Sequence, residues 1–166
     1  LDVVLEAIAR LRQVRPDLLV CLDLYGRDFA EVPLRDRAVA LAIDDRVTFH
    51  GRVPIEAIPA AIATADVGLA PTRRSPFTDF SLSTKAYEYA AMSRTVVASR
   101  LPMVERTFGD DVVTYQPGNA ADLAAALLGL IDQPDLREAR VARALTRVRG
   151  LAWEHEAKRY VALVDA

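Results

Sequence analysis

The sequence predicts an α/β fold in which a doubly wound parallel sheet carries helices on both faces. Short β-branched runs alternate with stretches of helical periodicity along most of the chain, which is the pattern of parallel sheets. The run at 18–25 is apolar almost throughout, as expected of a strand that is covered on both sides. With 166 residues, 52% of them hydrophobic, the chain is long enough for one domain with a real core.

The first half of the chain predicts two helix-to-strand units after an opening helix. Apolar residues recur at helical spacing from Leu1 to Leu11, and Pro16 ends that helix. Because a domain rarely begins with an uncapped helix, we expect further chain upstream. Strands are predicted at 18–25, 46–50 and 66–70, and helices at 31–42 and 55–65. Cys21 lies within the first of these strands, so we expect a buried thiol, and a lone cysteine excludes an internal disulfide.

The second half begins with an irregular segment at 72–80, and a helix follows at about residue 81. Strands are predicted at 95–98 and 112–115. Asn119 caps a helix at 120–131. The residues expected on the buried face of that helix are Leu123, Leu127, Leu128 and Ile131. Two more helices are predicted at 134–149 and 153–164.

The start of the helix near residue 81 is the strongest candidate site. A helix N-terminus carries unpaired N–H groups and partial positive charge, so a lysine there is unfavourable unless an anion binds. Ser83, Thr84 and Lys85 together indicate a phosphate site, and Glu88, one turn later, is placed to accept hydrogen bonds from sugar hydroxyls. The alternative is that Ser81 or Ser83 only caps the helix and that Lys85 and Glu88 form a surface ion pair.

Several other chemistries lack their signatures. The chain has no Gly-x-Gly-x-x-Gly fingerprint, no Walker phosphate loop and no Gly-x-Ser-x-Gly elbow. Its two histidines offer no histidine-rich metal site, and we expect no metal. His50 ends a strand and is either a ligand contact or a strand-end polar residue. A net charge of −2 gives no bias toward nucleic acid, and without a signal peptide or a long apolar run we expect a cytoplasmic protein.

Five blocks in sensible order resemble family 4 (group 1) retaining glycosyltransferases. These blocks are 45–53 (DRVTFHGRV), 65–72 (ADVGLAPT), 85–99 (KAYEYAAMSRTVVAS), 117–119 (PGN) and the helix that starts at Trp153 and Glu154. They are similar to the C-terminal, nucleotide-sugar-binding half of the GT-B fold, which is Rossmann-like. The resemblance therefore implies a Rossmann-like domain over 1–150, whose first strand lies upstream. It also implies a C-terminal helix over 151–166 that packs back on this domain or toward an absent N-terminal domain.

The resemblance also implies a role for each site residue. Glu88 stands where the second glutamate of the Glu-x7-Glu motif binds the ribose of the donor nucleotide. Ser83, Thr84 and Lys85, with Gly26, stand near the donor diphosphate. The loop formed by Gly51, Arg52 and Val53 is similar to the loop that lies along the nucleotide base.

Two departures from the family pattern affect this interpretation. Counting back from Glu88, the first motif glutamate falls on Phe80, so Asp79, Phe80 and Ser81 lie in the donor-sugar vicinity without the expected carboxylate. No catalytic residue is assigned. The glycine after the helix is replaced by Ser93, which is therefore expected to adopt a left-handed conformation.

For a longer chain, the resemblance implies transfer of a sugar from a nucleoside diphosphate donor to a hydroxyl acceptor with retention, and no cofactor beyond the donor. The upstream strand would be central in the sheet, so 1–166 alone would leave a gap between neighbouring strands. The acceptor-binding N-terminal domain would be a partner, with any peripheral membrane contact made only through that missing half. Arg73 and Arg74 are either solvated or contact a phosphorylated acceptor.

Two other functions stay open at this point. A glycosyltransferase-like binding module without turnover would account for Phe80, whereas Lys85 and Glu88 favour catalysis. A nucleotide-sugar epimerase of the GT-B type would need acid and base residues in the cleft. The only candidates for these are Asp79, His50 and Glu105.

Overall fold

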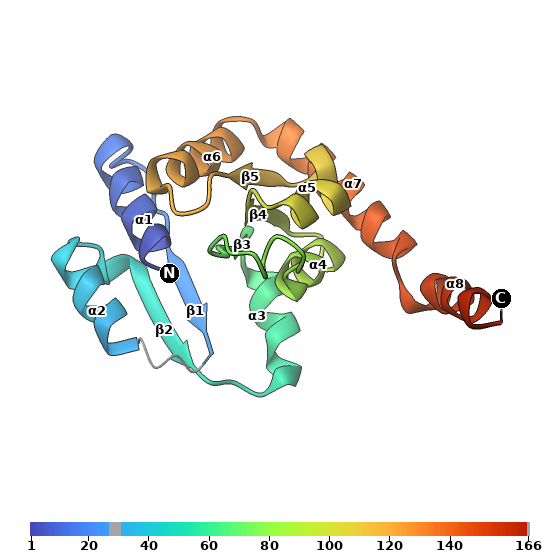
Figure 1. Cartoon of the computed structure of the whole chain (residues 1–166). Coiled ribbons are helices and arrows are strands. Elements are labelled where there is room, and N and C mark those ends of the chain that lie inside the picture. Colours follow the sequence, from blue (N-terminus) through green and yellow to red (C-terminus); the bar gives the residue numbers. More distant parts are fainter. Residues whose placement is uncertain (27–30, 166) are drawn as a thin grey trace.

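The computed structural model describes residues 1–26 and 31–165 and confirms an α/β fold (Figure 1). In chain order the regular elements are α1 (Asp2–Val14), β1 (Leu22–Tyr25), α2 (Glu31–Ala40), β2 (Val47–Gly51), α3 (Ile58–Thr64), β3 (Val67–Ala70), α4 (Thr84–Ala91), β4 (Thr95–Ser99), α5 (Pro102–Phe108), β5 (Val113–Tyr115), α6 (Ala120–Asp132), α7 (Pro134–Gly150) and α8 (Trp153–Val164). Short 3₁₀ turns at Asp44–Arg46, Ile55–Ala57 and Gly109–Asp111 lead into β2, α3 and β5. Strands and helices alternate in the predicted order.

The described strands form two parallel sheets. One contains β1 and β2, with Leu22 opposite Val47, and the other has the order β3-β4-β5, with Val67 opposite Thr95. Among these strands, β1 is hydrogen-bonded only to β2, and β3 only to β4 and not to β1. Each of β1 and β3 therefore keeps one edge that no described strand pairs with.

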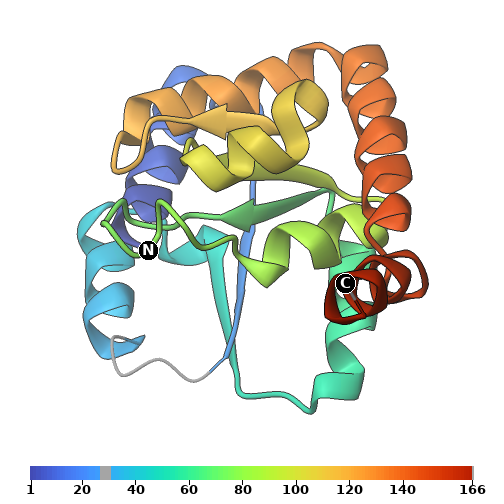
Figure 2. The same ribbon diagram turned by 45° about the vertical axis from the view of Figure 1, so that its right-hand side comes forward.

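Helices cover both faces of the sheets, and two hydrophobic clusters mark the two layers. On one face α1 and α6 lie side by side, with Leu5 and Leu123 fully buried between them (Figures 1 and 2). On the other face α4, α5 and α7 enclose a second cluster around Phe108. β4 is buried along its whole length. Of its adjacent residues, Val97 packs into the cluster under α1 and α6, and Val96 packs into the cluster around Phe108. Alternation along one strand thus joins the two layers.

The last two helices differ in how they attach to the domain. Asp111, 8% exposed, accepts hydrogen bonds from Arg143 Nε at 2.9 Å and Arg147 Nε at 2.7 Å, which fixes α7. Burial opposes ionisation of Asp111, but its hydrogen bonds with Arg147 and Arg143 prevail and hold the pKa of this carboxyl below its ordinary value. α8 instead extends away from the other helices, and none of its described residues is buried (Figure 1).

Three details differ from the sequence predictions. The strand predicted at 18–25 is hydrogen-bonded only over Leu22–Tyr25, and Cys21 is exposed and not buried. The physical reason is that the edge of this segment has no neighbouring strand on the side of β3. In α6, Leu130 is buried at 3% exposure while Ile131 is 38% exposed, so the buried face is rotated by one residue at that end.

Candidate functional site

At the start of α4, where the sequence predicts a phosphate site, no side chain of the described residues caps the helix. Ser83 is the N-cap residue, but within the described residues its side chain makes no capping hydrogen bond. The leading N–H groups of the helix are therefore available to a ligand. Thr84 and Lys85 are both exposed beside them.

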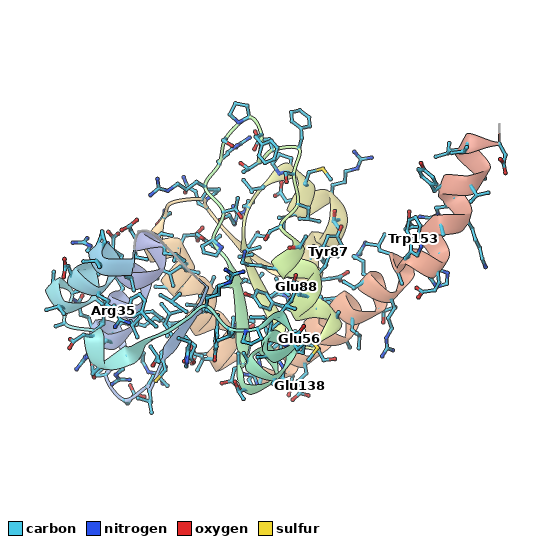
Figure 3. The ribbon with its side chains drawn as sticks, turned by 90° about the horizontal axis from the view of Figure 1, so that it is seen from below. Arg35, Glu56, Tyr87, Glu88, Glu138 and Trp153 are labelled. Carbon is cyan, nitrogen blue, oxygen red and sulfur yellow. The ribbon has the colours of Figure 1, made fainter. Side chains whose placement is uncertain are left out.

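The structure does not have the alternative arrangement of a capping serine and a surface ion pair. Across residues 1–26 and 31–165, neither Lys85 nor Glu88 forms a salt bridge, although the two are exposed and lie three residues apart on α4, a spacing that puts both on one side of the helix. Figure 3 shows Glu88 and its neighbour Tyr87 on α4. A cation and a carboxylate one turn apart, with no partner of their own, can each bind a different part of one ligand.

Close packing against β3 sets the position of α4. A Cβ added at Gly68 would lie 2.1 Å from Cγ of Tyr89, so the tyrosine ring lies directly on the glycine backbone. Burial, and secondarily the negative charge of Glu88, raise the pKa of the Tyr89 phenol. The helix ends at Ser93, whose φ of 55° confirms the predicted left-handed turn. Gly68, Tyr89 and Ser93 together hold the residues of the site on a fixed helix.

A cavity of about 1410 Å³ joins the start of α4 to the carboxyl ends of β1 and β2. Ser83, Thr84, Lys85 and Glu88 line it from one side, and Gly26 and Gly51 from the other. The two glycines have φ values of 122° and 66°, and Gly26 N–H donates to the Gly51 carbonyl at 2.8 Å. The predicted diphosphate and ribose residues therefore face one space, together with the first residue of the predicted base loop.

The remaining predicted residues are not part of this lining. Arg52 is exposed and Val53 half-buried, and neither borders the cavity as described. Phe80 is 86% exposed and also lies outside it. Asp79 is held by Arg74, whose Nε donates to its carboxylate at 3.0 Å. This pair, with Ser75 and Thr78 hydrogen-bonded at 3.1 Å, gives the predicted irregular segment an ordered turn.

A cluster of polar side chains at the ends of β1 and β2 was not predicted. His50 Nε2 lies 2.7 Å from Asp23 Oδ1, and the rings of His50 and Tyr25 stack with centroids 4.3 Å apart. Asp23 and Tyr25 also line the cavity. The signal was present in the sequence, because Asp23 and Tyr25 are two residues apart on one strand and share a face.

The described residues contain neither a metal-binding cluster nor a helix that could span a membrane. No group of three or more histidine, cysteine, aspartate or glutamate side chains is arranged to hold a metal ion. Nor is any described helix both long and apolar enough to cross a membrane. The cytoplasmic location stays a prediction.

Similarity to known proteins shows the family of this chain. Residues 1–133 match the family described as Glycosyl transferases group 1. The chain belongs to this family. A curated relative, the phosphatidyl-myo-inositol mannosyltransferase of Mycolicibacterium smegmatis, is 33% identical over 153 residues, which cover 91% of this chain and 37% of that glycosyltransferase. The chain thus spans well under half of this relative's length.

Solved glycosyltransferase structures share the fold of this group 1 chain. HepE from Anabaena, crystallised with UDP and glucose, aligns with a TM-score of 0.79 and 18% identity over 99% of this chain and 44% of its own. The C-terminal domain of a group 1 glycosyl transferase (LpcC) from Francisella tularensis aligns with a TM-score of 0.73 and 17% identity, over 89% of this chain and 76% of that domain. These matches confirm the predicted GT-B type of fold, and none of them supports the epimerase alternative.

Proposed function

We propose that this chain is the donor-binding domain of a retaining glycosyltransferase, which moves a sugar from a nucleoside diphosphate sugar to a hydroxyl acceptor. The observation that supports this most is the start of α4, where uncapped N–H groups, Lys85 and Glu88 face one cavity with Gly26 and Gly51. Membership of the group 1 family adds the reaction class.

Each side of the cavity takes one part of the donor in this proposal. The N–H groups at Ser83 and Thr84, with the ammonium of Lys85, bind the diphosphate, and Gly26 lets the opposite backbone approach it. Glu88 accepts hydrogen bonds from the ribose hydroxyls. When the sugar leaves, negative charge builds on the diphosphate, and these fixed donors stabilise that charge where it develops. The reaction scheme requires no metal.

The loop Gly51, Arg52 and Val53 is assigned to the nucleotide base, and the vicinity of Asp79, Phe80 and Ser81 to the donor sugar. The base loop is supported by the bond between Gly26 and Gly51, which holds it at the cavity edge. Phe80 stands where the family motif has its first glutamate. The neighbouring Asp79 does not take over the role of that glutamate, because its carboxylate is already paired with Arg74. Arg73, 88% exposed at its side chain, lies 3.5 Å from Asp2 through Nη2 and would leave this exposed ion pair to contact an acceptor. A second, acceptor-binding domain completes the enzyme.

One alternative has an observation in its favour. Phe80 is 86% exposed where the family pattern has a carboxylate, which fits a binding module that has lost turnover. Replacement of this carboxylate leaves the groups of α4 in place, so the two functions are separated by an assay of sugar transfer with the acceptor domain present, in which the binding module would bind the nucleotide and transfer no sugar.

Titration calorimetry of the chain with UDP, GDP, ADP and dTDP tests the proposal. UDP is the first candidate because the Anabaena protein with the same fold was crystallised with it. We expect one nucleotide to bind, and Lys85→Ala and Glu88→Ala each to weaken it by about 1–3 kcal/mol, the contribution of a charge-assisted hydrogen bond. Such a loss is about 5- to 150-fold in Kd.

Matched controls separate local contacts from general charge effects. Lys158→Ala on α8 and Glu138→Ala on α7 remove the same charges from exposed positions outside the cavity. They are expected to bind the nucleotide like the parent chain. A folded chain that binds none of the four nucleotides contradicts the proposal, and so does equal weakening by the control pair.

A further inference from the structure

We propose that a second pocket, formed between α4, α5, α7 and α8, binds a phosphorylated small molecule. This arginine pocket has a volume of about 400 Å³, within the range of about 300–1,000 Å³ that is usual for small-molecule sites. Three arginines line it: Arg106 from α5, Arg147 from α7 and Arg159 from α8. None of its lining residues borders the cavity of about 1410 Å³ at the start of α4, so the two sites are separate.

The charges around the arginine pocket favour an anion. No carboxylate of the described residues lines it beside the three guanidinium groups. Asp111, which Arg147 contacts, lies outside the lining and is shared with Arg143, so that one negative charge serves two positive ones. Like charges that gather in one place repel each other, and a bound anion turns that repulsion into attraction.

The three arginines also keep hydrogen-bond donors that the domain does not use. Arg106 is exposed and forms no hydrogen bond or ion pair among the residues that the structure describes. Arg147 donates to Asp111 through Nε at 2.7 Å, and its terminal nitrogens have no acceptor in the same part of the chain. Arg159 contacts Glu156 on its own helix through Nη1, and its side chain is 71% exposed. Forked guanidinium groups match the oxygen atoms of a phosphate, which accepts several such bonds at once.

The rest of the lining suits a small organic group beside the phosphate. Tyr87 and Thr107 carry hydroxyl groups, and Met103 and Leu151 provide apolar surface. The ring of Tyr87 packs against the fully buried Phe108, with centroids 5.4 Å apart. α4, α5 and α7 share this packing, so one wall of the pocket is fixed before a ligand arrives (Figure 1). A preformed wall lowers the entropy lost on binding.

An extended polyanion fits these observations less well. Nucleic acid is bound by basic groups spread along a surface, whereas here the arginines surround one pocket. The net charge of −2 gives the chain no general attraction for polyanions. The pocket therefore favours a phosphomonoester of a small molecule.

Amide NMR spectra recorded during a titration with phenyl phosphate test the site, because this probe joins a phosphate to a compact apolar ring. We expect saturable shifts at Tyr87, Thr107 and Leu151, and none there with phenol, which lacks the phosphate. Arg106→Gln and Arg159→Gln change exposed side chains, and each should raise the Kd about fivefold or more. The double variant should show no saturation. Urea denaturation verifies that each variant is folded.

Two control variants separate the arginine pocket from other causes. Arg149→Gln removes the same charge from an exposed position of α7 outside the lining, and it should leave the Kd unchanged. Lys85→Ala alters the cavity at the start of α4, and it should leave the shifts at Thr107 and Leu151 in place. Because the two sites share no lining residue, this result does not depend on whether a nucleotide binds at α4.

Three outcomes contradict the proposal. One is the absence of a saturable shift up to about 20 mM probe, a concentration that saturates a site with a Kd of about 1 mM. Another is equal weakening by Arg149→Gln, which would show a general effect of charge. The third is a set of shifts confined to Ser83–Lys85 and lost in Lys85→Ala, because the phosphate would then bind only at the start of α4.

Discussion

Adding one methyl group at Gly68 is expected to disturb both the stability of the domain and its nucleotide site. In Gly68→Ala, the new Cβ would lie 2.1, 2.2 and 2.6 Å from Cγ, Cδ2 and Cδ1 of Tyr89. Ordinary carbon contacts are about 3.5–4.0 Å, so the ring must retreat by roughly 1.5 Å. Because Tyr89 lies one residue after Glu88 on α4, its displacement moves the site helix with it.

The expected cost is the usual one for overpacking a well-filled region. The free energy of unfolding should fall by about 1–3 kcal/mol, measured by urea denaturation. Binding of the nucleotide should weaken about tenfold, because Lys85 and Glu88 lose their alignment with the ligand. Adding Tyr89→Leu to Gly68→Ala removes the ring and should recover part of both losses.

Gly129→Ala on α6 is the matched control. Its added Cβ would meet nothing within 4 Å, so this variant should be neutral or more stable by about 0.5–1 kcal/mol, as for alanine in a helix interior. If Gly68→Ala unfolds at the same urea concentration as the parent and binds nucleotide equally well, close packing against β3 does not position α4.

Two further predictions concern Asp111, which binds two arginines of α7, and Ser93, which follows α4. Asp111→Asn should lower stability at neutral pH by about 1–3 kcal/mol, because Arg143 and Arg147 lose a buried carboxylate partner. Since the pKa of Asp111 is lowered by folding, its contribution is present above the ordinary carboxyl pKa and is lost as pH falls through the folded pKa. The stability difference between parent and variant in urea should therefore shrink below about pH 4, and a constant difference would exclude this linkage. Ser93→Gly should raise the urea midpoint and increase the free energy of unfolding by about 1 kcal/mol. The reason is that the φ of 55° at Ser93 costs an L-residue about this much, whereas glycine adopts it without strain. An unchanged or lower midpoint would show that Ser93 is not strained.

The sequence was sufficient for the order of the elements because each local signal agreed with the fold. Asn119 was predicted to cap a helix, and its Oδ1 accepts from the N–H groups of Ala121 and Asp122 at 3.1 and 3.0 Å. Ser93 stands where the family has a glycine and was therefore predicted to adopt a left-handed conformation, and its φ is positive as expected. Caps and turns are set by a few neighbouring residues, and so they can be predicted from sequence alone.

Sequence patterns say least about segments whose structure depends on a neighbouring strand or domain. The segment before Leu22 has the composition of a strand, but a strand also needs a neighbour to bond, and Cys21 is exposed on its unpaired side. The packing of α8, on this domain or toward an N-terminal one, stays a prediction: its apolar stripe is exposed, with Trp153 at 69% and Val164 at 67%. Figure 3 shows Trp153 far from Glu88, out on this helix. Hydrophobic periodicity predicts that a face will be covered but not what covers it.

The candidate site was predicted more completely at α4 than elsewhere. The spacing of Lys85 and Glu88 by one helical turn predicted that they share a face of the helix, and both line the cavity in the structure. The pairing of Asp23 with His50 was missed because it joins residues 27 positions apart, through the register of two parallel strands. Contacts of this kind require the strand order, which the sequence gives only indirectly.

Amide chemical shifts measured while UDP is added show whether the start of α4 and the carboxyl ends of β1 and β2 form one nucleotide site. We predict that the largest saturable shifts occur at Ser83–Lys85, Glu88, Gly26 and Gly51, and that Lys85→Ala reduces them. If UDP binds the parent chain and the largest shifts lie elsewhere, for example around α8, the start of α4 is not the nucleotide site.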